Sequence, residues 1–405
     1  SDLGELLPHL GGRDRIEALL GYGWALQWTE ATDETNAAAE EALHLAEAAD
    51  DGELVPVAKA LVSQSLAMRG GPGDLDSAGE LGEEALRMWL PGARPWWHLN
   101  HEHMLGEQYY WTGRLADGHA LMTSASRSGS DPQSIQARLR SAALQAQILC
   151  SLGQYEESIR LFDETTRIAV EAGRPIRIVR NYSTQPLREL FDLAEARRRS
   201  EESLEGADEA EGFMMPRANA RADVMTVAVM TGDLETAEKF WRLQWDESNT
   251  TARAWTRWLL PCRLAAARAQ MELMTNHTEQ AMEWGRKAIE VSKPVRRLKY
   301  EIVGRTILGR ALVAAGKPDE AVTELTLAAA QADSLGSPSI RWEVLAALGR
   351  AQYAAGDDTA AERTFGSAST VIRDIASGLA PRRSEGFLGA EPVREVLKGA
   401  TKAQL

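Results

Sequence analysis

The sequence predicts an all-α fold: a right-handed α-solenoid of about eight helix pairs, with a period of about 40 residues and a short C-terminal cap. Two observations predict it. A short segment, in which a Gly is followed by polar residues and then a small residue, recurs along the chain, and small and apolar residues flank it at helical offsets. The segments begin at Gly73, Gly113, Gly153, Gly232, Gly316 and Gly356. A fixed period of this length in helical sequence is typical of a solenoid.

The segment 316–321 shows why these residues favour a turn between two helices. Gly316 can take the left-handed conformation that ends a helix without a Cβ penalty. Asp319 and Glu320 follow within four positions, where negative charge favours the N-terminus of the next helix. Ala321 is small enough to let the second helix lie close against the first. We therefore expect a helix–turn–helix unit at each copy.

The residues around each segment repeat in size as well as in spacing. Leu308 and Gly309 lie eight and seven residues before Gly316, and Leu325 and Ala328 lie nine and twelve after it. Residues of the same kind surround two other copies: Leu105, Gly106, Tyr109, Met122 and Ala125 around Gly113, and Leu348, Gly349, Phe365 and Ala368 around Gly356. This ladder is similar to the tetratricopeptide (TPR) pattern, whose usual period is 34. About six extra residues per unit would lengthen the helices and the link to the next pair.

The repeat boundaries predict one superhelical domain over residues 1–405. Degenerate copies near Phe191 and Asn276 fill the two long gaps between the clear ones. The expected helix pairs are roughly 14–50, 54–90, 96–128, 133–173, 176–206, 216–248, 252–292, 296–335 and 338–377, with a cap over 378–405. The links 128–132 and 173–175 hold Gly and Pro, the residues that commonly end one helix and begin the next.

Composition excludes several classes of function. The formal charge is −14 and the pI is near 5.2, whereas nucleic-acid phosphates favour a basic surface. No apolar run approaches the length of a membrane span, and residues 1–4 resemble no signal peptide but look like the cut edge of a longer protein. Cys150 and Cys262 form no disulfide framework. A cytoplasmic protein without a membrane or direct nucleic-acid partner is therefore expected.

The sequence shows no chemistry that would make the chain an enzyme. It has no phosphate-binding Gly-rich loop, no Gly-x-Ser-x-Gly and no Cys-x-x-Cys. The nearest metal motif is His98, His101 and His103, but these cannot share one helix face, so ordinary helix histidines are favoured. We expect no catalytic residue, no metal and no cofactor.

Four tryptophans, Trp241, Trp245, Trp255 and Trp258, follow one another at helical spacing. Large aromatic residues in this arrangement usually fill the core between long helices. An aromatic box for a ligand is the alternative interpretation.

The concave groove is the surface on which a helical solenoid usually acts, and the first helix of each pair lines it. Positions thirteen, ten, six and three residues before each repeat Gly are expected to point there. They give the candidate ligand- or partner-binding residues Asn100, His103, Glu107, Tyr110, Arg140, Gln147, Asn181, Gln185, Arg188, Asn219, Arg263, Gln270 and Arg310. Such groups could hydrogen-bond an extended peptide or a small anionic ligand, but a solvated groove is polar in either case.

Several stretches also carry a family resemblance: 297–301 (RLKYE), 308–312 (LGRAL), 332–338 (ADSLGSP) with Arg341 and Trp342, 371–376 (VIRDIA) and the cap 387–397. Together they resemble the TPR region that follows a nucleotide-binding module in large bacterial signalling ATPases of the STAND type. Those proteins often carry a class III adenylate/guanylate cyclase domain or a LuxR-type helix-turn-helix. The resemblance covers residues 14–397, and no ATPase or output domain lies in this chain, so it implies no catalytic residue here.

Two hypotheses of different kinds remain open. In the first, the array is a sensor and interaction region that binds a protein, a peptide or a small-molecule effector in its groove and acts on ATPase or output domains outside this chain. In the second, it is a structural spacer that holds such domains apart with an empty groove. An enzyme would need a convergent acid, base or nucleophile set, which the sequence lacks.

The repeat register makes a stability prediction. Ala321→Leu places a larger side chain between two packed helices and should lower the free energy of unfolding by about 1–3 kcal/mol. Glu205→Gln, on a charged surface, is the control and should have almost no effect. Chemical denaturation followed by circular dichroism measures both, and a neutral Ala321→Leu would show that the register is wrong.

Overall fold

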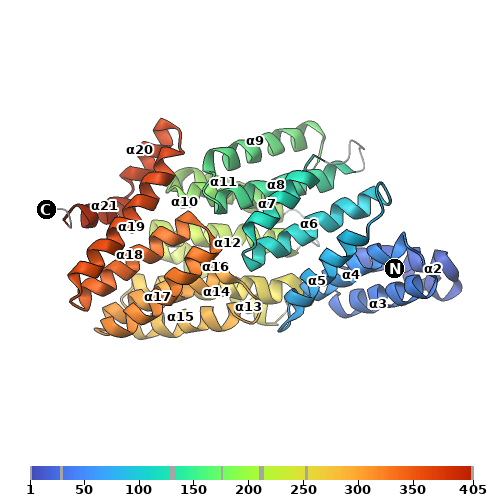
Figure 1. Cartoon of the computed structure of the whole chain (residues 1–405), viewed down its shortest axis with the longest axis horizontal. Coiled ribbons are helices and arrows are strands. Elements are labelled where there is room, and N and C mark those ends of the chain that lie inside the picture. Colours follow the sequence, from blue (N-terminus) through green and yellow to red (C-terminus); the bar gives the residue numbers. More distant parts are fainter. Residues whose placement is uncertain are drawn as a thin grey trace.

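The computed structural model describes residues 2–27, 31–127, 134–174, 177–208, 214–250 and 254–402. In these ranges all regular structure is helical, and consecutive helices pack on one another along the molecule (Figure 1). The predicted fold class, an α-solenoid of TPR-like helix pairs, is confirmed. Among the helices described, none combines the length and the apolarity that crossing a membrane requires.

The described helices form nine consecutive pairs. The pairs are α2 (Gly12–Gln27) with α3 (Thr32–Ala48), α4 (Leu54–Arg69) with α5 (Asp74–Met88), α6 (Pro95–Thr112) with α7 (Leu115–Ala125), α8 (Ile135–Ser151) with α9 (Tyr155–Glu171), α10 (Arg177–Glu189) with α11 (Leu193–Asp208), α12 (Met214–Thr231) with α13 (Leu234–Thr250), α14 (Ala254–Met274) with α15 (Thr278–Ser292), α16 (Leu298–Ala314) with α17 (Pro318–Leu335), and α18 (Pro338–Ala354) with α19 (Asp358–Ser377). Short helices precede and follow the pairs: α1 (Asp2–Leu6) and a 3-10 helix (Leu7–His9) at the start, α20 (Pro381–Gly389) and α21 (Glu391–Lys402) at the cap.

The recurring glycines adopt the left-handed backbone that the sequence predicts. Gly316 has φ +73° and Gly356 has φ +83°. In the two degenerate units Phe191 (φ +60°) and Asn276 (φ +61°) take the same conformation. A residue with a Cβ is strained in this conformation by roughly 1–2 kcal/mol. The two degenerate units nevertheless keep the turn geometry.

The small residues of the ladder let the two helices of a pair approach each other. A Cβ added to Gly309 would lie 2.4 Å from Leu325, and one added to Gly349 would lie 2.9 Å from Phe365. Ala321 and Leu325 are fully buried in the same cluster. The alternation of small and large residues therefore allows close helix–helix packing.

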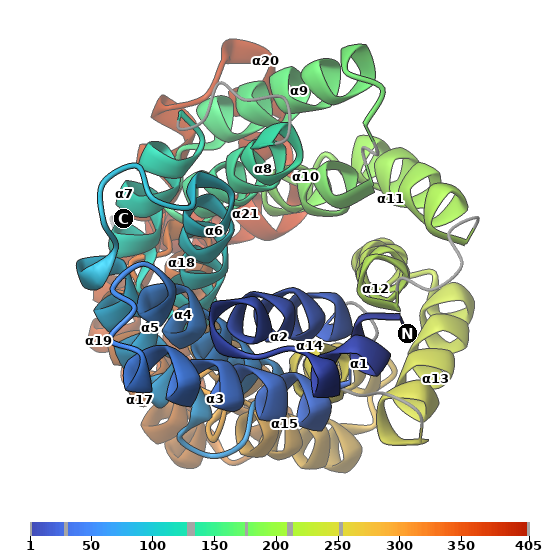
Figure 2. The same ribbon diagram turned by 90° about the vertical axis from the view of Figure 1, so that its right-hand side faces the viewer.

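Successive turns of the superhelix pack directly on one another. Helix α4 contacts α14, and α6 contacts α16, so each turn takes about five pairs. The indole Nε1 of Trp258 donates to the carbonyl of Met68 at 3.2 Å across this seam. One shared core combines Leu99 and Leu144 of the earlier turn with Ile302 and Ile340 of the later one. Figure 2 looks along the superhelix axis and shows the helices arranged in a ring.

The four tryptophans that follow one another in sequence divide between two separate clusters. Trp241 and Trp245 pack with Trp284, while Trp255 and Trp258 pack with Trp111. The indole N–H of Trp241 donates to the carbonyl of Leu264 at 3.0 Å. These rings fill helix–helix contacts, as the favoured interpretation expects, and they do not converge into one aromatic box.

The seam between turns makes a prediction with an internal control. Gly70 and Gly336 both end a helix in the left-handed conformation, with φ +60° and +70°. A Cβ on Gly70 would lie 2.2 Å from the Trp258 ring, whereas nothing lies within 4 Å of a Cβ on Gly336. Gly336→Ala should lower the free energy of unfolding by about 1–2 kcal/mol through backbone strain alone.

Gly70→Ala carries the same strain and should lose roughly 1–3 kcal/mol more, because the Trp258 ring must move. Urea denaturation of the two variants beside the wild type measures the difference. Equal losses would show that the seam is loose enough to absorb a methyl group.

Candidate functional site

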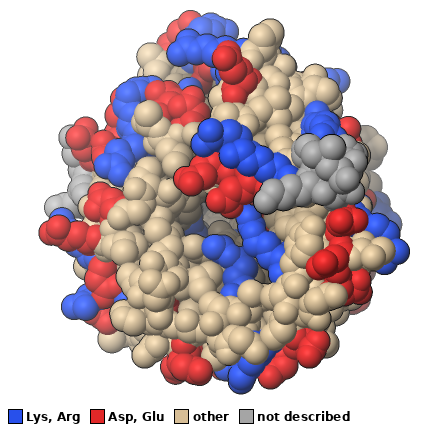
Figure 3. Space-filling model, turned by 90° about the vertical axis from the view of Figure 1, so that its left-hand side faces the viewer, with Lys and Arg blue, Asp and Glu red and all other residues tan. Residues whose placement is uncertain are grey.

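The first helices of the pairs from α6 to α18 contact one another in succession, and polar side chains of several of them bond to one another. Burial and the nearby charge of Glu107 on α6 raise the pKa of Tyr182 on α10, and Arg140 on α8 and Asp223 on α12 also lie close enough to act on that pKa. Charged groups from three other helices therefore lie near Tyr182. Figure 3 shows the end of the molecule near the C-terminus, where a central depression contains Lys and Arg side chains. We use the term axial hollow for the space around the polar side chains of Tyr110, Arg188, Asp223, Arg263 and Lys299.

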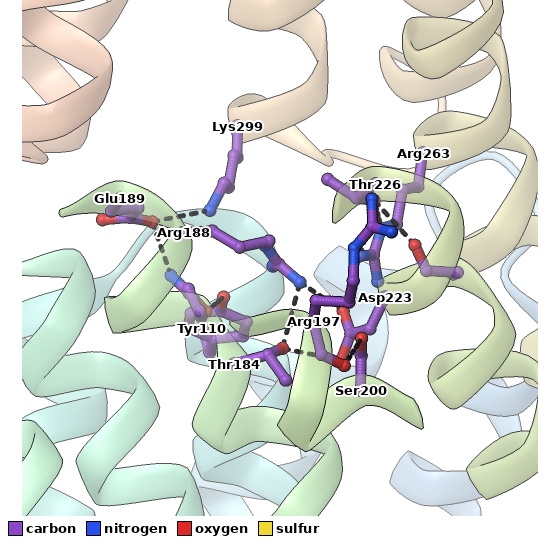
Figure 4. A network of polar contacts seen from close by, with 12 residues as sticks. Tyr110, Thr184, Arg188, Glu189, Arg197, Ser200, Asp223, Thr226, Arg263 and Lys299 are labelled. Carbon is purple, nitrogen blue, oxygen red and sulfur yellow. Dashed lines mark hydrogen bonds and ion pairs between the residues drawn. The ribbon is translucent and has the colours of Figure 1, made fainter. Parts of the chain in front are cut away.

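A triad of charges lies at the centre of this polar region. Arg188 of α10 and Arg263 of α14 both donate to the Asp223 carboxylate of α12, at 2.5 and 2.6 Å. The side chains of Arg188, Arg263 and Asp223 are only 14%, 15% and 4% exposed, respectively. Thr184 donates to the second oxygen of Asp223 at 2.9 Å, and Thr226 accepts from Arg263 at 2.7 Å. Figure 4 shows these side chains pointing toward one another.

Two pKa shifts describe the electrostatic character of the triad. Burial alone would raise the pKa of Asp223, but Arg188 and Arg263 hold it below its ordinary value. Burial would also raise the pKa of the neighbouring Tyr300 phenol, yet four cations, Arg263, Lys299, Arg297 and Arg188, lower it. Since two guanidinium groups share one carboxylate, the triad carries one net positive charge, and its surroundings favour anions.

A second cluster centres on the carboxylate of Glu189, the residue after Arg188. Lys299 of α16 approaches it to 3.5 Å (Figure 4), and Ser339 of α18 donates to it at 2.9 Å. From the earlier turn it accepts hydrogen bonds from Gln185 (2.9 Å), Tyr155 (3.2 Å) and Cys150 (3.6 Å). Glu189 therefore joins two successive turns of the superhelix at the wall of the hollow.

Lys299 completes this wall and keeps its charge despite burial. Desolvation would lower the pKa of its ammonium group, but Tyr110 and Glu189 raise it above the ordinary value. Tyr110 and Lys299 also line a small pocket with Ser151, Arg297 and Ser337. The Tyr110 hydroxyl donates to Gln185 at 3.2 Å, so this pocket adjoins the Glu189 cluster.

The hollow continues toward the cap through Arg310 and Glu343. Arg310 donates to Gln270 at 2.9 Å. The side chain of Glu343 reaches solvent, but the surrounding helices displace much of the water near it. This desolvation, followed by the charge of Glu189, raises the pKa of Glu343 to about 7. At the opposite end, His103 and Glu107 form a pair at 3.6 Å near Arg140.

The structure brings many of the predicted residues into one connected region. Tyr110, Gln185, Arg188 and Arg263 belong to the two clusters, His103, Glu107 and Arg140 lie at one end of the hollow, and Gln270 and Arg310 lie at the other. Asn100 is buried and donates to the carbonyl of Trp96 on its own helix. Gln147 and Asn219 are half-buried. The side chain of Asn181 lies outside the described part of the chain.

Sequence reasoning missed several residues of the region, and only some could have been found. Thr226 lies six residues before Gly232, and Glu343 lies thirteen before Gly356, so the repeat offsets already indicate both. Asp223 and Lys299 lie at other offsets. Their roles depend on partners in helices far away in sequence, for which the repeat pattern gives no signal.

The histidines near residue 100 point in different directions. The His101 ring stacks on Trp89, its Nε2 is 2.8 Å from the Gly82 carbonyl, and burial lowers its pKa to about 4. His103 pairs with Glu107 instead. Within the described residues, no three His, Cys, Asp or Glu side chains are grouped to hold a metal ion.

The triad makes a prediction about stability and its pH dependence. Asp223→Asn leaves two largely buried guanidinium groups without their carboxylate and should lower the free energy of unfolding at pH 7 by about 3–5 kcal/mol. Because the folded pKa of Asp223 is depressed, its contribution is present above about pH 4 and is lost as the pH falls through the folded pKa.

Denaturation of the variant and the wild type between pH 3 and pH 8 tests this. The difference should shrink only at the acid end, and Asp374→Asn, on the exposed face of α19, should match the wild type throughout. A constant difference across the range would contradict the assignment of the charge to Asp223.

No protein family model matches the chain, and no curated protein matches it by sequence. Several solved structures are similar to it in fold. The Rap conjugation gene regulator of the plasmid pLS20, solved with the Phr* peptide, is 13% identical, with 93% of this chain and 98% of that chain covered and a TM-score of 0.57. The APC/C hetero-tetramer Cut9–Hcn1 is 13% identical over 98% of this chain and 77% of that one, with a TM-score of 0.57. NprR with its cognate peptide NprX is 9% identical over 85% and 97%, with a TM-score of 0.53. At these identities the likeness shows the fold alone, a helical-repeat solenoid.

Proposed function

We propose that this chain is a non-catalytic interaction region that binds a peptide segment in the axial hollow. The observation that carries the proposal is the convergence of hydrogen-bonding side chains from α6, α10, α12, α14 and α16 on one enclosed region (Figure 4). An extended peptide presents backbone donors and acceptors at every residue, and amide, hydroxyl and guanidinium groups can satisfy them. Two similar solved structures, the pLS20 Rap regulator and NprR, hold peptides, which supports this kind of ligand.

The chemistry of the hollow favours binding over catalysis. Burial, together with the charge of Glu189, raises the pKa values of Cys150 and Tyr155, so both groups stay neutral. A neutral thiol is a poor nucleophile. The net charge of −14 opposes nucleic acid as the ligand.

We further propose that the region belongs to a larger bacterial signalling regulator of the STAND type and acts in the cytoplasm. The resemblance of stretches such as 297–301 and 371–376 supports this context. A bound peptide would change the activity of attached ATPase or output domains only if it bound their two states with different affinities.

A structural spacer is the second candidate, and the packing between turns favours it. The contacts of Trp258 with Met68 and of Leu335 with Gly113 join successive turns and would make the superhelix stiff. In that case the polar groups of the hollow serve stability, and no peptide needs to bind.

Affinity selection separates the two candidates. The purified chain is incubated with a synthetic pool of random heptapeptides, unbound peptide is removed, and retained peptides are identified by mass spectrometry. We expect a restricted subset to be retained. Retention of none would favour the spacer, and a non-peptide mass released from the native protein on denaturation would indicate a small-molecule effector.

Two matched substitutions locate the binding surface. Thr226 lies at the triad, whereas Thr370 lies on the exposed face of α19, and the hydroxyl of each bonds to the carbonyl four residues earlier. Thr226→Trp should obstruct the hollow and reduce retention at least tenfold, while Thr370→Trp should leave it unchanged. Circular dichroism checks that both variants are folded, and equal retention by both would place the peptide elsewhere.

A further inference from the structure

We infer that Arg188 and Arg263 form an anchor for a carboxylate of the bound peptide, from either an acidic side chain or the C-terminus. This inference rests on the proposed peptide-binding function and names the chemical class that the hollow selects. Three features of the triad carry it: unused donors, an excess of positive charge, and a position shared by three neighbouring helices.

The donors of the two guanidinium groups are only partly used. Arg188 bonds to Thr184 and Asp223 through Nη1 alone, at 3.0 and 2.5 Å, and its Nε and Nη2 have no partner among the described residues. Arg263 uses Nε and Nη2, and its Nη1 likewise has none there. The side chains of Arg188 and Arg263 keep 14% and 15% of their surface exposed, so the two guanidinium groups are not sealed from solvent. Unused, accessible guanidinium N–H groups are the donors that bind carboxylates most strongly.

Asp223 fixes the two arginines without consuming their charge. Its Oδ1 accepts from both guanidinium groups and its Oδ2 accepts from Thr184, so both oxygens of the carboxylate are occupied inside the triad. One negative charge against two positive ones leaves an excess that a single ligand carboxylate would neutralise. Both arginines are thereby held in place before a ligand arrives, which lowers the entropic cost of binding it.

The neighbourhood adds further positive charge. Lys299 and Arg297 act on the Tyr300 phenol together with the two arginines, and their combined effect lowers its pKa despite burial. The carboxylate of Glu189, the residue after Arg188, is occupied by Lys299, Gln185 and Ser339. The acidic outer surface of the protein is therefore no obstacle to a locally anion-selective site.

The arrangement also limits the size of the ligand. Arg188, Asp223 and Arg263 come from α10, α12 and α14, three neighbouring first helices, and Figure 2 shows that these belong to a ring of helices. A single peptide carboxylate can approach such a site, whereas a duplex nucleic acid or a membrane surface is too large. The positive charge of the triad therefore indicates a small anionic group rather than a polyanion.

Three synthetic heptapeptide pools test the inference. In the first, both termini are capped and Asp and Glu are included. In the second, both termini are capped and Asn and Gln replace the acids. The third matches the second but has a free C-terminal carboxylate. Wild-type protein should retain the first or the third pool about 10- to 100-fold better than the second, because charge-assisted hydrogen bonds are lost with the carboxylate.

The identity of the preferred pool tells an acidic side chain from a terminal carboxylate. Arg188→Gln, Asp223→Asn and Arg263→Gln combined replace the triad by neutral hydrogen-bonding groups, and this variant should retain all three pools equally. Arg373→Gln, on the exposed face of α19, is the control and should keep the wild-type preference.

Each outcome decides the question. Equal retention of all three pools by the wild type would overturn the carboxylate anchor while leaving peptide binding intact, and this comparison needs no variant. A preference that persists in the neutral triad would also overturn it. Retention of no pool would refute the proposed function and, with it, this inference.

Discussion

The packing of one superhelical turn on the next is the constraint on which the rest of the structure depends. Trp258 packs against Gly70, Leu335 against Gly113, and Pro338 against Gly153, so helix-ending glycines of the earlier turn receive side chains of the later one. An added Cβ at Gly70, Gly113 or Gly153 would lie only 2.2–3.0 Å from these side chains. The left-handed glycine thus serves twice: it turns the chain and leaves room for the next turn.

This tight winding gives the hollow its electrostatics. With about five pairs per turn, first helices that do not follow one another in the chain, such as α10 and α16, bring polar side chains within reach of one another. These side chains are only partly open to water, and charges find partners in the wall, as Asp223 does with two arginines and Glu189 does with Lys299. Pairing holds these groups in place. Because two arginines share one aspartate, the triad keeps one net positive charge.

The repeat pattern predicts what is local and fails where structure depends on distant contacts. Period, turn glycines and the small–large ladder all follow from neighbouring residues, and even the degenerate turns at Phe191 and Asn276 keep the predicted backbone. The number of pairs per turn is different, because it results from small rotations added over many units. The contact of Trp258 with Met68, 190 residues earlier, cannot be inferred from either segment. Consequently the sequence could nominate Arg188 and Arg263 as inward residues, but it could not show that Asp223 joins them.

Consecutive residues connect the candidate binding site to the packing between turns. Arg188 belongs to the triad, and Glu189, the next residue on α10, holds Lys299 and Ser339 of the later turn. Both lie in the last turn of the same helix, so a rotation of that helix end which moved one side chain would move the other. A ligand that bound equally well before and after such a rotation would have no effect on the superhelix. A ligand that Arg188 could bind in only one orientation of the helix end would favour that orientation. It would thereby favour the arrangement of the two turns that Glu189 stabilises in the same orientation.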